Sequence, residues 1–424
     1  RKIAFMAYSL FVKFKVNAYI SPNIFYGNPA QLWLFFALNI LVISTPMKTT
    51  ASEKFNWMIA SPESRGLDSK SLKKLDQELK KGDHGYVDSF IVIKNNVIVF
   101  EEYYEIDYGD LTEKRFGEQK IIMEQNYGQN ANPIYNYYDS GWHPYYKETD
   151  LHTIQSVTKS VTSALIGIAI DEGFIPSIDQ EIIEYFPEHV SLFDEARKEA
   201  ITIRDLLTMT AGIQWDEDSY DYTDPLNDAA NMENSEDWLD YILSKPMEYE
   251  PGQNFVYNSG ITIILSHILE QTTGLSAENF AVKYLLEPLE IKDFFWKKTP
   301  KNLTDTESGL YLSSRDFAKI GLLYLNNGMW NNRQIVPENW INQTVTPAIE
   351  TGFSNGNAYG FQWWLHNYEK GSDKIMYCGS GYGGQYLLIF PEYDLVAAFT
   401  GWNVFDVERP AKEYLASRIL SALK

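Results

Sequence analysis

The sequence predicts a mixed α/β (α+β) fold, in which an antiparallel sheet is flanked by helices from both ends of the chain and carries a large all-helical lobe. Runs typical of strands lie at about residues 85–104 and again at about 374–401, and the chain between them has mostly helical periodicity. Strands at the two ends of a chain usually complete one sheet, and tight hairpins make such a sheet antiparallel. The helical block, about residues 160–365, is then an insertion beside the sheet within one domain, residues 53–424.

The first residues differ from the rest and predict an N-terminal leader over residues 1–52. Residues 32–43 read LWLFFALNILVI, an apolar run that is too short for a comfortable membrane span of ~20 residues. The run fits a signal-peptide core followed by small residues, and an uncleaved membrane anchor is the alternative. We therefore expect an exported protein, periplasmic or extracellular, that contacts a membrane only through this segment if it is uncleaved.

Two elements lead into the predicted sheet. Residues 67–82, LDSKSLKKLDQELKKG, have the spacing of an amphipathic helix, with Asp68 or Ser69 as its cap. The β-rich runs 90–93 and 97–103 then flank an Asn-Asn pair, which is a hairpin signal. We therefore expect a helix followed by the first two antiparallel strands.

Residues 105–150 show no clear period and are rich in Tyr, Asn and Gly. This composition predicts a long ordered loop over one face of the molecule. Its aromatic side chains could stack on a sugar or a polymer chain, and packing that holds an irregular loop in place explains them equally well.

The central block contains several helical segments, and the tail returns to strands before a last helix. The predicted helices cover residues 156–172, 203–208, 235–244, 259–273, 277–285 and 314–326. The tail contains KIMYC, GQYLLIFPEY and LVAAFTG, which form a plausible antiparallel meander. Residues 408–423, ERPAKEYLASRILSAL, have the pattern of an amphipathic helix that closes the fold.

Composition argues against several classes of function. The 424 residues carry a net charge of −21 without a visible basic patch, so we expect no nucleic acid partner. The single cysteine, Cys378, rules out an internal disulfide. None of the six histidines lies in a metal-binding motif, and no phosphate-binding loop is present, so we expect neither a metal nor a cofactor.

The clearest chemical signal is in residues 152–173, HTIQSVTKSVTSALIGIAIDEG, where a polar opening meets an apolar helix. Ser156 and Lys159 are three residues apart, which places their side chains on one helix face, one turn apart. A lysine can take the proton of a serine hydroxyl only when it is neutral, so its pKa of ~10.4 must fall to about 7. Burial in this nearly uncharged helix is expected to lower the pKa of Lys159. A second S-x-x-K, residues 71–74, lies on a lysine-rich helix, where solvated lysines stay charged.

Two further segments supply groups that such a site needs. Residues 249–274, YEPGQNFVYNSGITIILSHILEQTTG, place Tyr257 and Ser259 before a second apolar helix. The tyrosine could relay protons to the lysine and the leaving group, and the serine could bond Lys159 or a substrate. A capped helix start with a packed tyrosine is the alternative. Residues 378–401, CGSGYGGQYLLIFPEYDLVAAFTG, have a glycine-rich strand edge whose N–H groups can approach a ligand, or they form a strained turn.

The chain resembles the serine β-lactamase/penicillin-binding protein superfamily over about residues 85–420, in motif order as well as motif content. The resemblance is carried by QSVTKSVTSALIGIAID, ITIRDLLTMTAGIQWDE, PGQNFVYNSG and SGYGGQYLLIFPEYDLVAAFTG. Within the superfamily the chain is similar to class C-like serine hydrolases. It is most similar to their 6-aminohexanoate (nylon) oligomer hydrolase branch, through a Y-x-S second motif and the GYGGQ element. The resemblance implies a β-lactamase/DD-peptidase-like fold.

The resemblance also implies a role for each motif residue. Ser156 is then the acylated nucleophile, Lys159 the base that activates it, and Tyr257 the catalytic tyrosine. The oxyanion hole is expected to consist of the backbone N–H groups of Ser156 and Gly381. Ser259 stands where class C β-lactamases carry Asn.

One departure from the family pattern concerns the substrate. Cys378-Gly379-Ser380 stand where class C β-lactamases carry Lys-Thr-Gly, so the basic residue that grips a β-lactam carboxylate is missing. We therefore expect inefficient penicillin hydrolysis. The expected substrate-binding residues are Ser259, Ser380, Tyr382 and, in the loop GIQWDEDSY, Asp216. An acid in this loop would bind an amine of the substrate, and a solvated acidic run is the alternative.

Three functions compete on these grounds. The first is a serine hydrolase that cleaves a small-molecule or peptide-like amide or ester through an acyl-enzyme. The second is a low-turnover, penicillin-binding-like protein that binds or senses peptidoglycan. The third, an envelope structural protein, has no specific support. The complete set of Ser156, Lys159 and Tyr257 favours the hydrolase.

Overall fold

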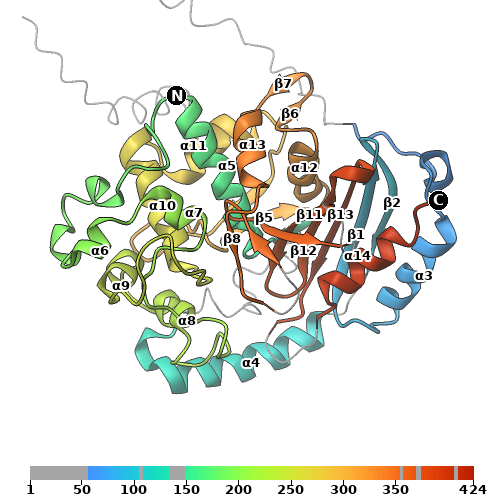
Figure 1. Cartoon of the computed structure of the whole chain (residues 1–424). Helices are drawn as coiled ribbons and strands as arrows, with labels where there is room; N and C mark the ends of the chain where they lie inside the picture. Colours follow the sequence, from blue (N-terminus) through green and yellow to red (C-terminus); the bar gives the residue numbers. More distant parts are fainter. Residues whose placement is uncertain (1–55, 105–107, 133–148, 354–356, 369–373, 405–408) are drawn as a thin grey trace, which may run out of the picture. The chain divides into compact units, whose positions relative to one another are not determined.

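The computed structural model describes residues 56–104, 108–132, 149–353, 357–368, 374–404 and 409–424. All of them lie in the unit that begins at Phe55 (Figure 1). The predicted leader lies outside the described residues, and so does part of the tyrosine-rich segment. Among the helices of the described ranges, none is long and apolar enough to cross a bilayer.

The main sheet has eight antiparallel strands in the order β2-β1-β13-β12-β11-β10-β9-β8. Their bounds are β1 Val87–Lys94, β2 Val97–Tyr103, β8 Ile349–Glu350, β9 Ala358–Tyr359, β10 Trp364–Asn367, β11 Ile375–Gly381, β12 Gln385–Phe390 and β13 Leu395–Gly401. Strands from the two ends of the chain meet where Phe90 of β1 lies opposite Phe399 of β13. The β1–β2 hairpin turns at Asn95 and Asn96, whose φ angles are 52° and 61°. The predicted antiparallel sheet is confirmed.

Helices cover both faces of this sheet because its inner strands are apolar on both sides. On one face Phe90 and its neighbours pack with the terminal helices α3 (Ser69–Lys80) and α14 (Lys412–Leu420). On the other face Val396 packs with α12 (Ser314–Leu325) and the lobe. The predicted flanking helices are therefore present.

The helical lobe is built around α5 (Val157–Asp171), whose residues from Val157 to Ala169 are all buried. It packs against α10 (Gly260–Thr273), and both helices begin and end within one residue of their predicted bounds. The other helices of the lobe are α6 Ala196–Glu199, α7 Ile203–Leu207, α8 Asp228–Glu233, α9 Trp238–Ser244, α11 Ala277–Ala281 and α13 Glu338–Thr344. Short 3₁₀ and π turns add η5 Ile182–Tyr185, η6 Val190–Leu192 and η7 Val282–Leu286.

Short elements complete the described structure. One small sheet has the order β3-β5-β4, with β3 Leu151–Thr153, β4 Phe294–Trp296 and β5 Leu310–Ser313, and β6 Met329–Trp330 pairs with β7 Arg333–Gln334. The 3₁₀ turns are η1 Pro62–Arg65, η2 Gly128–Asn130 and η8 Pro391–Tyr393. The strand β3 leads into the predicted nucleophile, because the chain runs from it directly into Ser156.

The helical lobe ends earlier than the predicted boundary near residue 365. Residues 349–367 contribute β8, β9 and β10 to the main sheet. These strands have only two to four residues, which is too short for an alternating pattern to be visible.

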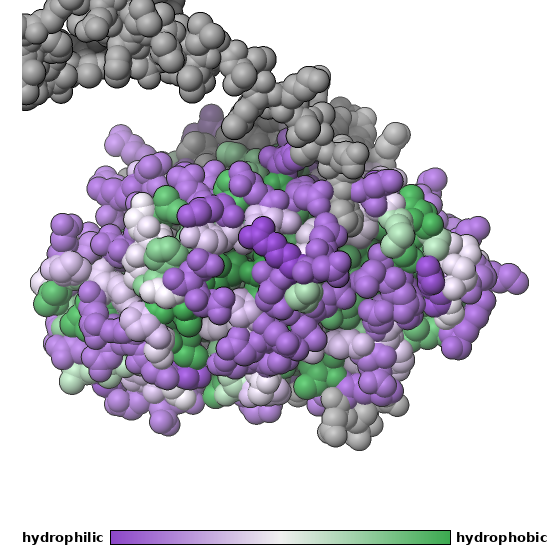
Figure 2. Space-filling view, turned by 90° about the horizontal axis from the view of Figure 1, so that it is seen from above, coloured by the Kyte–Doolittle hydropathy of each residue, from purple (hydrophilic) through white to green (hydrophobic). Residues whose placement is uncertain are grey.

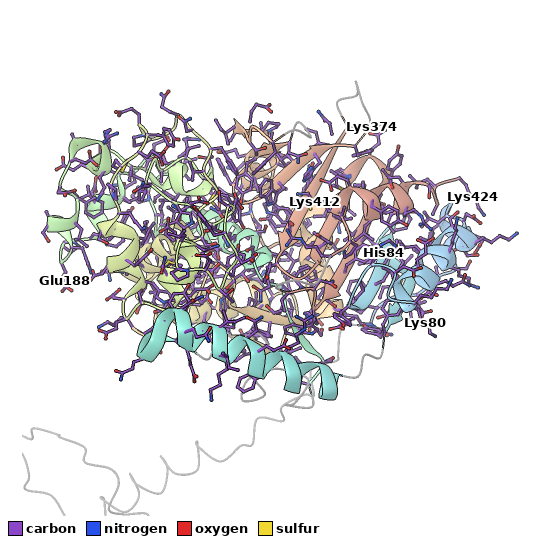
Figure 3. All side chains as sticks on the ribbon, turned by 90° about the horizontal axis from the view of Figure 1, so that it is seen from below. Lys80, His84, Glu188, Lys374, Lys412 and Lys424 are labelled. Atoms are coloured by element: carbon purple, nitrogen blue, oxygen red, sulfur yellow. The ribbon has the colours of Figure 1, made fainter. Side chains whose placement is uncertain are left out.

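The prediction of a loop over residues 105–150 is wrong where α4 (Tyr108–Tyr127) lies. Its sequence, YGDLTEKRFGEQKIIMEQNY, has no apolar stripe, so the usual helical signal is absent. Figures 1 and 3 show α4 running along one side of the unit. Asn126 Nδ2 and Tyr127 OH, at its end, donate hydrogen bonds to the carbonyls of Thr223 (2.6 Å) and Asp224 (3.2 Å) in the lobe. Residues 133–148 lie outside the described residues.

The face shown in Figure 2 is dominated by hydrophilic residues, with apolar ones scattered among them. Such a face agrees with the net charge of −21.

Candidate active site

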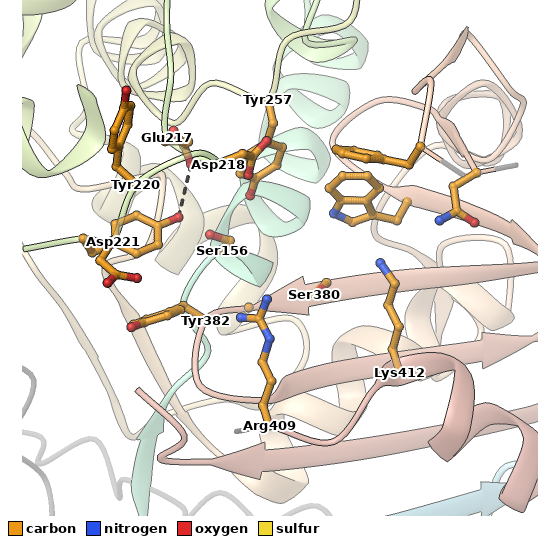
Figure 4. Close-up of a pocket in the computed structure, with 15 residues that line it drawn as sticks. Ser156, Glu217, Asp218, Tyr220, Asp221, Tyr257, Ser380, Tyr382, Arg409 and Lys412 are labelled. Carbon is orange, nitrogen blue, oxygen red and sulfur yellow. Dashed lines mark hydrogen bonds between the residues drawn. The ribbon is translucent and has the colours of Figure 1, made fainter. Parts of the chain in front are cut away.

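A pocket of about 520 Å³ opens where the start of α5, the end of β11 and the start of α14 meet (Figure 4). Its lining residues are Ser156, Glu217, Asp218, Tyr220, Asp221, Tyr222, Tyr257, Phe353, Asn357, Trp364, Ser380, Gly381, Tyr382, Arg409 and Lys412. The predicted nucleophile, the predicted tyrosine and the glycine-rich strand edge therefore lie around one cavity.

Ser156 is positioned by a sharp turn between β3 and α5. The N–H of Gln155 donates a hydrogen bond to Thr153 Oγ1 (3.1 Å). Gln155 has a φ of 46°, a conformation that residues other than glycine adopt rarely and often at functional sites. Ser156 takes the cap position of α5, yet its side chain makes no capping hydrogen bond. Its hydroxyl is therefore available to the pocket and to the next turn of the helix.

Lys159 lies one turn further along α5 and is fully buried, with 1% of its surface exposed. Its Nζ donates hydrogen bonds to Ser156 Oγ (3.1 Å), to the Glu307 carbonyl (3.0 Å) and to Glu307 Oε2 (3.1 Å). All three protons of an ammonium group thus have an acceptor. The expected proximity of Ser156 and Lys159 is present, and their catalytic roles stay predictions.

The expectation that burial lowers the pKa of Lys159 is wrong. Burial acts in that direction, but nearby Tyr257, Glu307 and Glu217 raise the pKa above its ordinary value. Tyr257 can do so only when its phenol is ionised, so near neutral pH the raising effect comes from Glu307 and from the ionised fraction of Glu217. Burial also acts to raise the pKa of Glu307, yet Lys159 holds it below the ordinary value. The resting site therefore contains an ammonium and a carboxylate in contact.

Glu307 is the functional neighbour that sequence reasoning missed. It stands in DTESG, between a loop and β5, where nothing in the local pattern distinguishes a buried acid from a solvated one. Its loop is shaped by Asp305, whose Oδ1 accepts hydrogen bonds from the backbone N–H groups of Glu307 (3.2 Å) and Ser308 (3.0 Å). This turn directs the Glu307 side chain toward α5.

Tyr257 reaches the same site from the segment before α10. Its ring stacks on Trp364 (centroids 5.6 Å apart), and Lys159 Nζ lies 5.3 Å from the ring centroid. Burial raises the pKa of Tyr257, while the charge of Lys159 acts to lower it. The phenol is therefore protonated at neutral pH and can donate its proton rather than accept one.

Ser259 lies away from the pocket lining and is 2% exposed. Its Oγ donates a hydrogen bond to Glu217 Oε1 (2.9 Å) and its N–H to Oε2 (2.7 Å), so it contacts Glu217 instead of Lys159. Trp215 Nε1 also donates to Glu217 (2.6 Å). Burial raises the pKa of Glu217 to about 7, against these donors and Lys159. A role for Ser259 in substrate binding stays a prediction.

Asp216 accepts a hydrogen bond from the N–H of Ser219 (3.0 Å) and also lies outside the pocket lining. The acids of this loop that do line the pocket are Glu217, Asp218 and Asp221. Neighbouring side chains of a loop can face in opposite directions, and the sequence alone does not fix which of them faces a cavity.

The glycine-rich end of β11 packs directly on the start of α5. A Cβ on Gly381 would lie 2.6 Å from the carbonyl oxygen of Ile154, and one on Gly379 would lie 2.6 Å from Val157 Cγ1. Only glycine therefore allows this approach. Gly381 lines the pocket together with Ser380 and Tyr382, as the predicted oxyanion and substrate roles require.

Two cations from the C-terminal segment line the pocket opposite the acidic loop. Arg409 and Lys412 extend toward it in Figure 4, and Lys412 Nζ lies 4.7 Å from the Trp364 ring centroid. Sequence reasoning assigned these residues only to a closing helix. Cys378, where class C β-lactamases carry Lys, is fully buried within β11. The positive charge at this pocket thus comes from another part of the chain.

Comparisons with known proteins agree with this arrangement. A protein-family model described as Beta-lactamase matches residues 75–416. The chain is 26% identical to the 6-aminohexanoate-dimer hydrolase of Paenarthrobacter ureafaciens over 288 residues, which cover 63% of this chain and 69% of the relative.

Solved structures show the same fold. One is the octameric penicillin-binding protein homologue from Pyrococcus abyssi, with a TM-score of 0.57 and 18% identity over 83% of this chain and 77% of that one. Another is a family VIII carboxylesterase, with a TM-score of 0.59 and 15% identity over 87% of this chain and 98% of that one.

Proposed function

Because this chain belongs to the beta-lactamase family, we propose that it is a serine hydrolase that cleaves an amide or ester through an acyl-enzyme on Ser156. The observation that carries the proposal is the 3.1 Å contact between Ser156 Oγ and Lys159 Nζ at the wall of a pocket that Tyr257 also lines. The similarity to a 6-aminohexanoate-dimer hydrolase supports a hydrolytic reaction.

The proposed acylation uses four groups. Ser156 Oγ attacks the substrate carbonyl carbon, and its proton passes to Lys159. The carbonyl oxygen becomes an oxyanion that the backbone N–H groups of Ser156 and Gly381 stabilise, and one such donor is worth roughly 10²–10³ in rate. Tyr257 gives a proton to the leaving amine or alcohol. Lys159 must first lose one ammonium proton before it can accept that of Ser156.

Deacylation repeats these roles with water as the nucleophile. Lys159, again without one ammonium proton, takes the proton of the attacking water. Tyr257 gives its proton to Ser156 Oγ as the acid product leaves, and Lys159 then returns a proton to Tyr257. The same backbone N–H groups stabilise the second oxyanion.

The charges of the pocket narrow the substrate class. Arg409 and Lys412 favour an anionic group on one side of the cleaved bond, and Asp218 and Asp221 favour a cationic group on the other. We propose a small amide or ester with at least one charged end. A plate of short-chain p-nitrophenyl esters with neutral and with charged acyl groups, D-Ala-D-Ala peptides and a chromogenic cephalosporin tests this class. Faster turnover of the neutral esters than of the charged esters would contradict it.

Labelling with a fluorophosphonate tests the acyl-enzyme directly. One adduct per chain is expected, on Ser156 by peptide mass, with none in Ser156→Ala. Tyr257→Phe keeps the ring that stacks on Trp364, so its melting temperature should match that of the wild type while ester turnover slows. A folded protein that resists every acylating probe would favour the binder or sensor of peptidoglycan.

Export is also a proposal. The apolar run in residues 32–43 supports a leader over residues 1–52, and its cleavage is read from the mass of the protein recovered outside the cytoplasm. Recovery of the full-length chain in the cytoplasm alone would contradict export.

A further inference from the structure

A cluster of buried charged side chains lies on the far side of Lys159 from Ser156. It consists of Glu233 at the end of α8, Lys297 after β4, and Asp305 and Glu307 in the loop before β5. None of the four is more than 4% exposed. We call these four residues the rear cluster. Burying four ionisable groups is costly unless they are paired and hydrogen-bonded, so their position beside a catalytic candidate calls for a role.

The hydrogen-bond acceptors of Lys159 define which group can take its proton. The three acceptors around Nζ are Ser156 Oγ, the Glu307 carbonyl and Glu307 Oε2. A hydroxyl and a carbonyl cannot hold an additional proton at neutral pH, whereas a carboxylate can. Among the described residues, Glu307 is therefore the acidic group in hydrogen-bond contact with this ammonium. Its Oε2 lies 3.1 Å from Nζ, the same distance that separates Nζ from Ser156 Oγ.

The other carboxylate oxygen of Glu307, Oε1, is held by neighbours other than Lys159. Ser308 Oγ donates a hydrogen bond to Glu307 Oε1 (2.8 Å), and Glu233 forms a hydrogen bond with the same carboxyl group. Two buried carboxyl groups that share a hydrogen bond cannot both be ionised, because one of them must supply the proton. Burial and the nearby Glu307 keep Glu233 protonated, since they raise its pKa well above the ordinary value. Glu307 is thus the charged member of the pair, with one oxygen fixed and the other on Lys159.

We propose, on the premise that Ser156 is acylated, that Glu307 is a positioning residue that accepts a proton from Lys159 during acylation. Nζ passes one ammonium proton to Glu307 Oε2 as it takes the proton of Ser156 Oγ. The bond between Oγ and the carbonyl carbon forms, and the C=O π electrons move to the oxygen. When the tetrahedral intermediate collapses, its oxyanion re-forms the carbonyl and the bond to the leaving group breaks. The proton on Glu307 then returns through Lys159 and Tyr257 to the leaving group, so protons and electrons balance.

The pH dependence of this relay depends on every titratable group that faces it. Those groups are Glu217 and Tyr257 on the pocket side, and Glu233, Lys297 and Asp305 in the rear cluster. None of the four residues of the rear cluster, Glu307 included, lines the pocket. A variant of Glu307 therefore changes the relay without removing a substrate contact.

The test is the pH profile of fluorophosphonate labelling at Ser156 in the wild type and in Glu307→Gln, followed by intact mass from about pH 5 to 10. In the wild type, Glu307 is ionised at any pH above the usual pKa range of carboxyl groups. The acid limb of the labelling rate is therefore expected at low pH. In Glu307→Gln, Lys159 must lose its proton to water, and the limb is expected to move to higher pH. The labelling rate near pH 7 should fall on the order of 10²–10⁴-fold.

The direction in which the acid limb moves distinguishes this relay from a lysine that loses its proton directly to water. If wild-type Lys159 lost its proton to water, removing the Glu307 charge would make that loss easier and would move the limb to lower pH. A limb that moves downward, or that stays in place, overturns the proposal. Absence of labelling in the wild type at every pH would instead reject the proposed function.

Two matched variants guard against a purely structural effect. Asp305→Asn makes the same acid-to-amide change in the same loop, keeps the oxygen that accepts from the N–H groups of Glu307 and Ser308, and should move the limb less than Glu307→Gln. Glu307→Asp retains a carboxylate and should return the limb toward the wild-type position. If Asp305→Asn moves the limb as far as Glu307→Gln does, or if Glu307→Asp behaves like Glu307→Gln, the contact between Glu307 and Lys159 is not the cause.

Discussion

The ammonium of Lys159 and the carboxylate of Glu307 depend on each other, since each would be an unpaired charge in the interior without its partner. Their side chains are 1% and 4% exposed. Removing one member of such a pair is usually more destabilising than replacing both, because the remaining charge keeps its desolvation penalty. The pair therefore contributes to stability and to the proposed chemistry at once, and variants must separate the two.

Lys159→Ala should lower acylation by several orders of magnitude and also lower the free energy of unfolding, by about 3–5 kcal/mol. The double variant Lys159→Ala, Glu307→Gln should regain part of that stability without regaining labelling, because no charge is left unpaired. Urea denaturation gives the free energies, and intact mass gives the labelling. A double variant less stable than Lys159→Ala would mean that Glu307 is not the buried partner.

At the scale of elements, the site depends on how closely α5 fits its neighbours. A Cβ on Gly167, on the face of α5 toward α13, would lie 2.3 Å from Trp340 Cγ. Buried helices that approach this closely leave no room for a methyl group. The proposed nucleophile is thus held at the start of a helix whose position is fixed on several sides, with β11 at its start and α13 further along.

Gly167→Ala should therefore lower the free energy of unfolding by about 1–3 kcal/mol through overpacking. Gly117→Ala in α4 is the matched control, because a Cβ there meets no atom within 4 Å. Inside a helix where the added methyl group meets no neighbour, the change from Gly to Ala should instead stabilise by about 0.5–1 kcal/mol. The two free energies of unfolding, measured in urea, should shift in opposite directions, and equal shifts would contradict the close packing of α5.

At the scale of the whole molecule, an ion pair between α3 and α14 is one of several contacts that join the two ends of the described unit. Arg418 Nη1 forms an ion pair with Glu78, and Tyr414 OH donates a hydrogen bond to the same carboxylate (2.7 Å). Arg418 lowers the pKa of Glu78 to about 2. A lowered pKa means that the contact stabilises the fold above the unfolded carboxyl pKa of about 4.3 and ceases to do so as pH falls toward 2.

The melting temperature of Glu78→Gln should accordingly lie below that of the wild type at neutral pH. The difference should shrink as the pH falls through the range from about 4 to 2, since the wild type then loses the same charge. Thermal unfolding followed by circular dichroism at several pH values measures it. A difference that stays constant down to the lowest pH would show that packing, and not the ion pair, is responsible.

The sequence predicted the elements that have a clear hydrophobic pattern, and the motif residues, because their signals are local. The spacing of Ser156 and Lys159 fixes them on one face of α5, and the Asn-Asn pair fixes the β1–β2 hairpin. α4 was missed because it has no apolar stripe, and β8–β10 because they are too short to show alternation.

What the sequence by itself determined is therefore the order of the clearly patterned elements, the antiparallel sheet built from both ends of the chain, and the identity of the motif residues. Only the tertiary structure decided the charge of Lys159, because that charge depends on Glu307, which is 148 residues away along the chain. It also decided that the cations of the pocket come from Arg409 and Lys412. The physical reason is the same in both cases: a pKa or a pocket's charge is set by groups that folding brings together, and no local pattern records them.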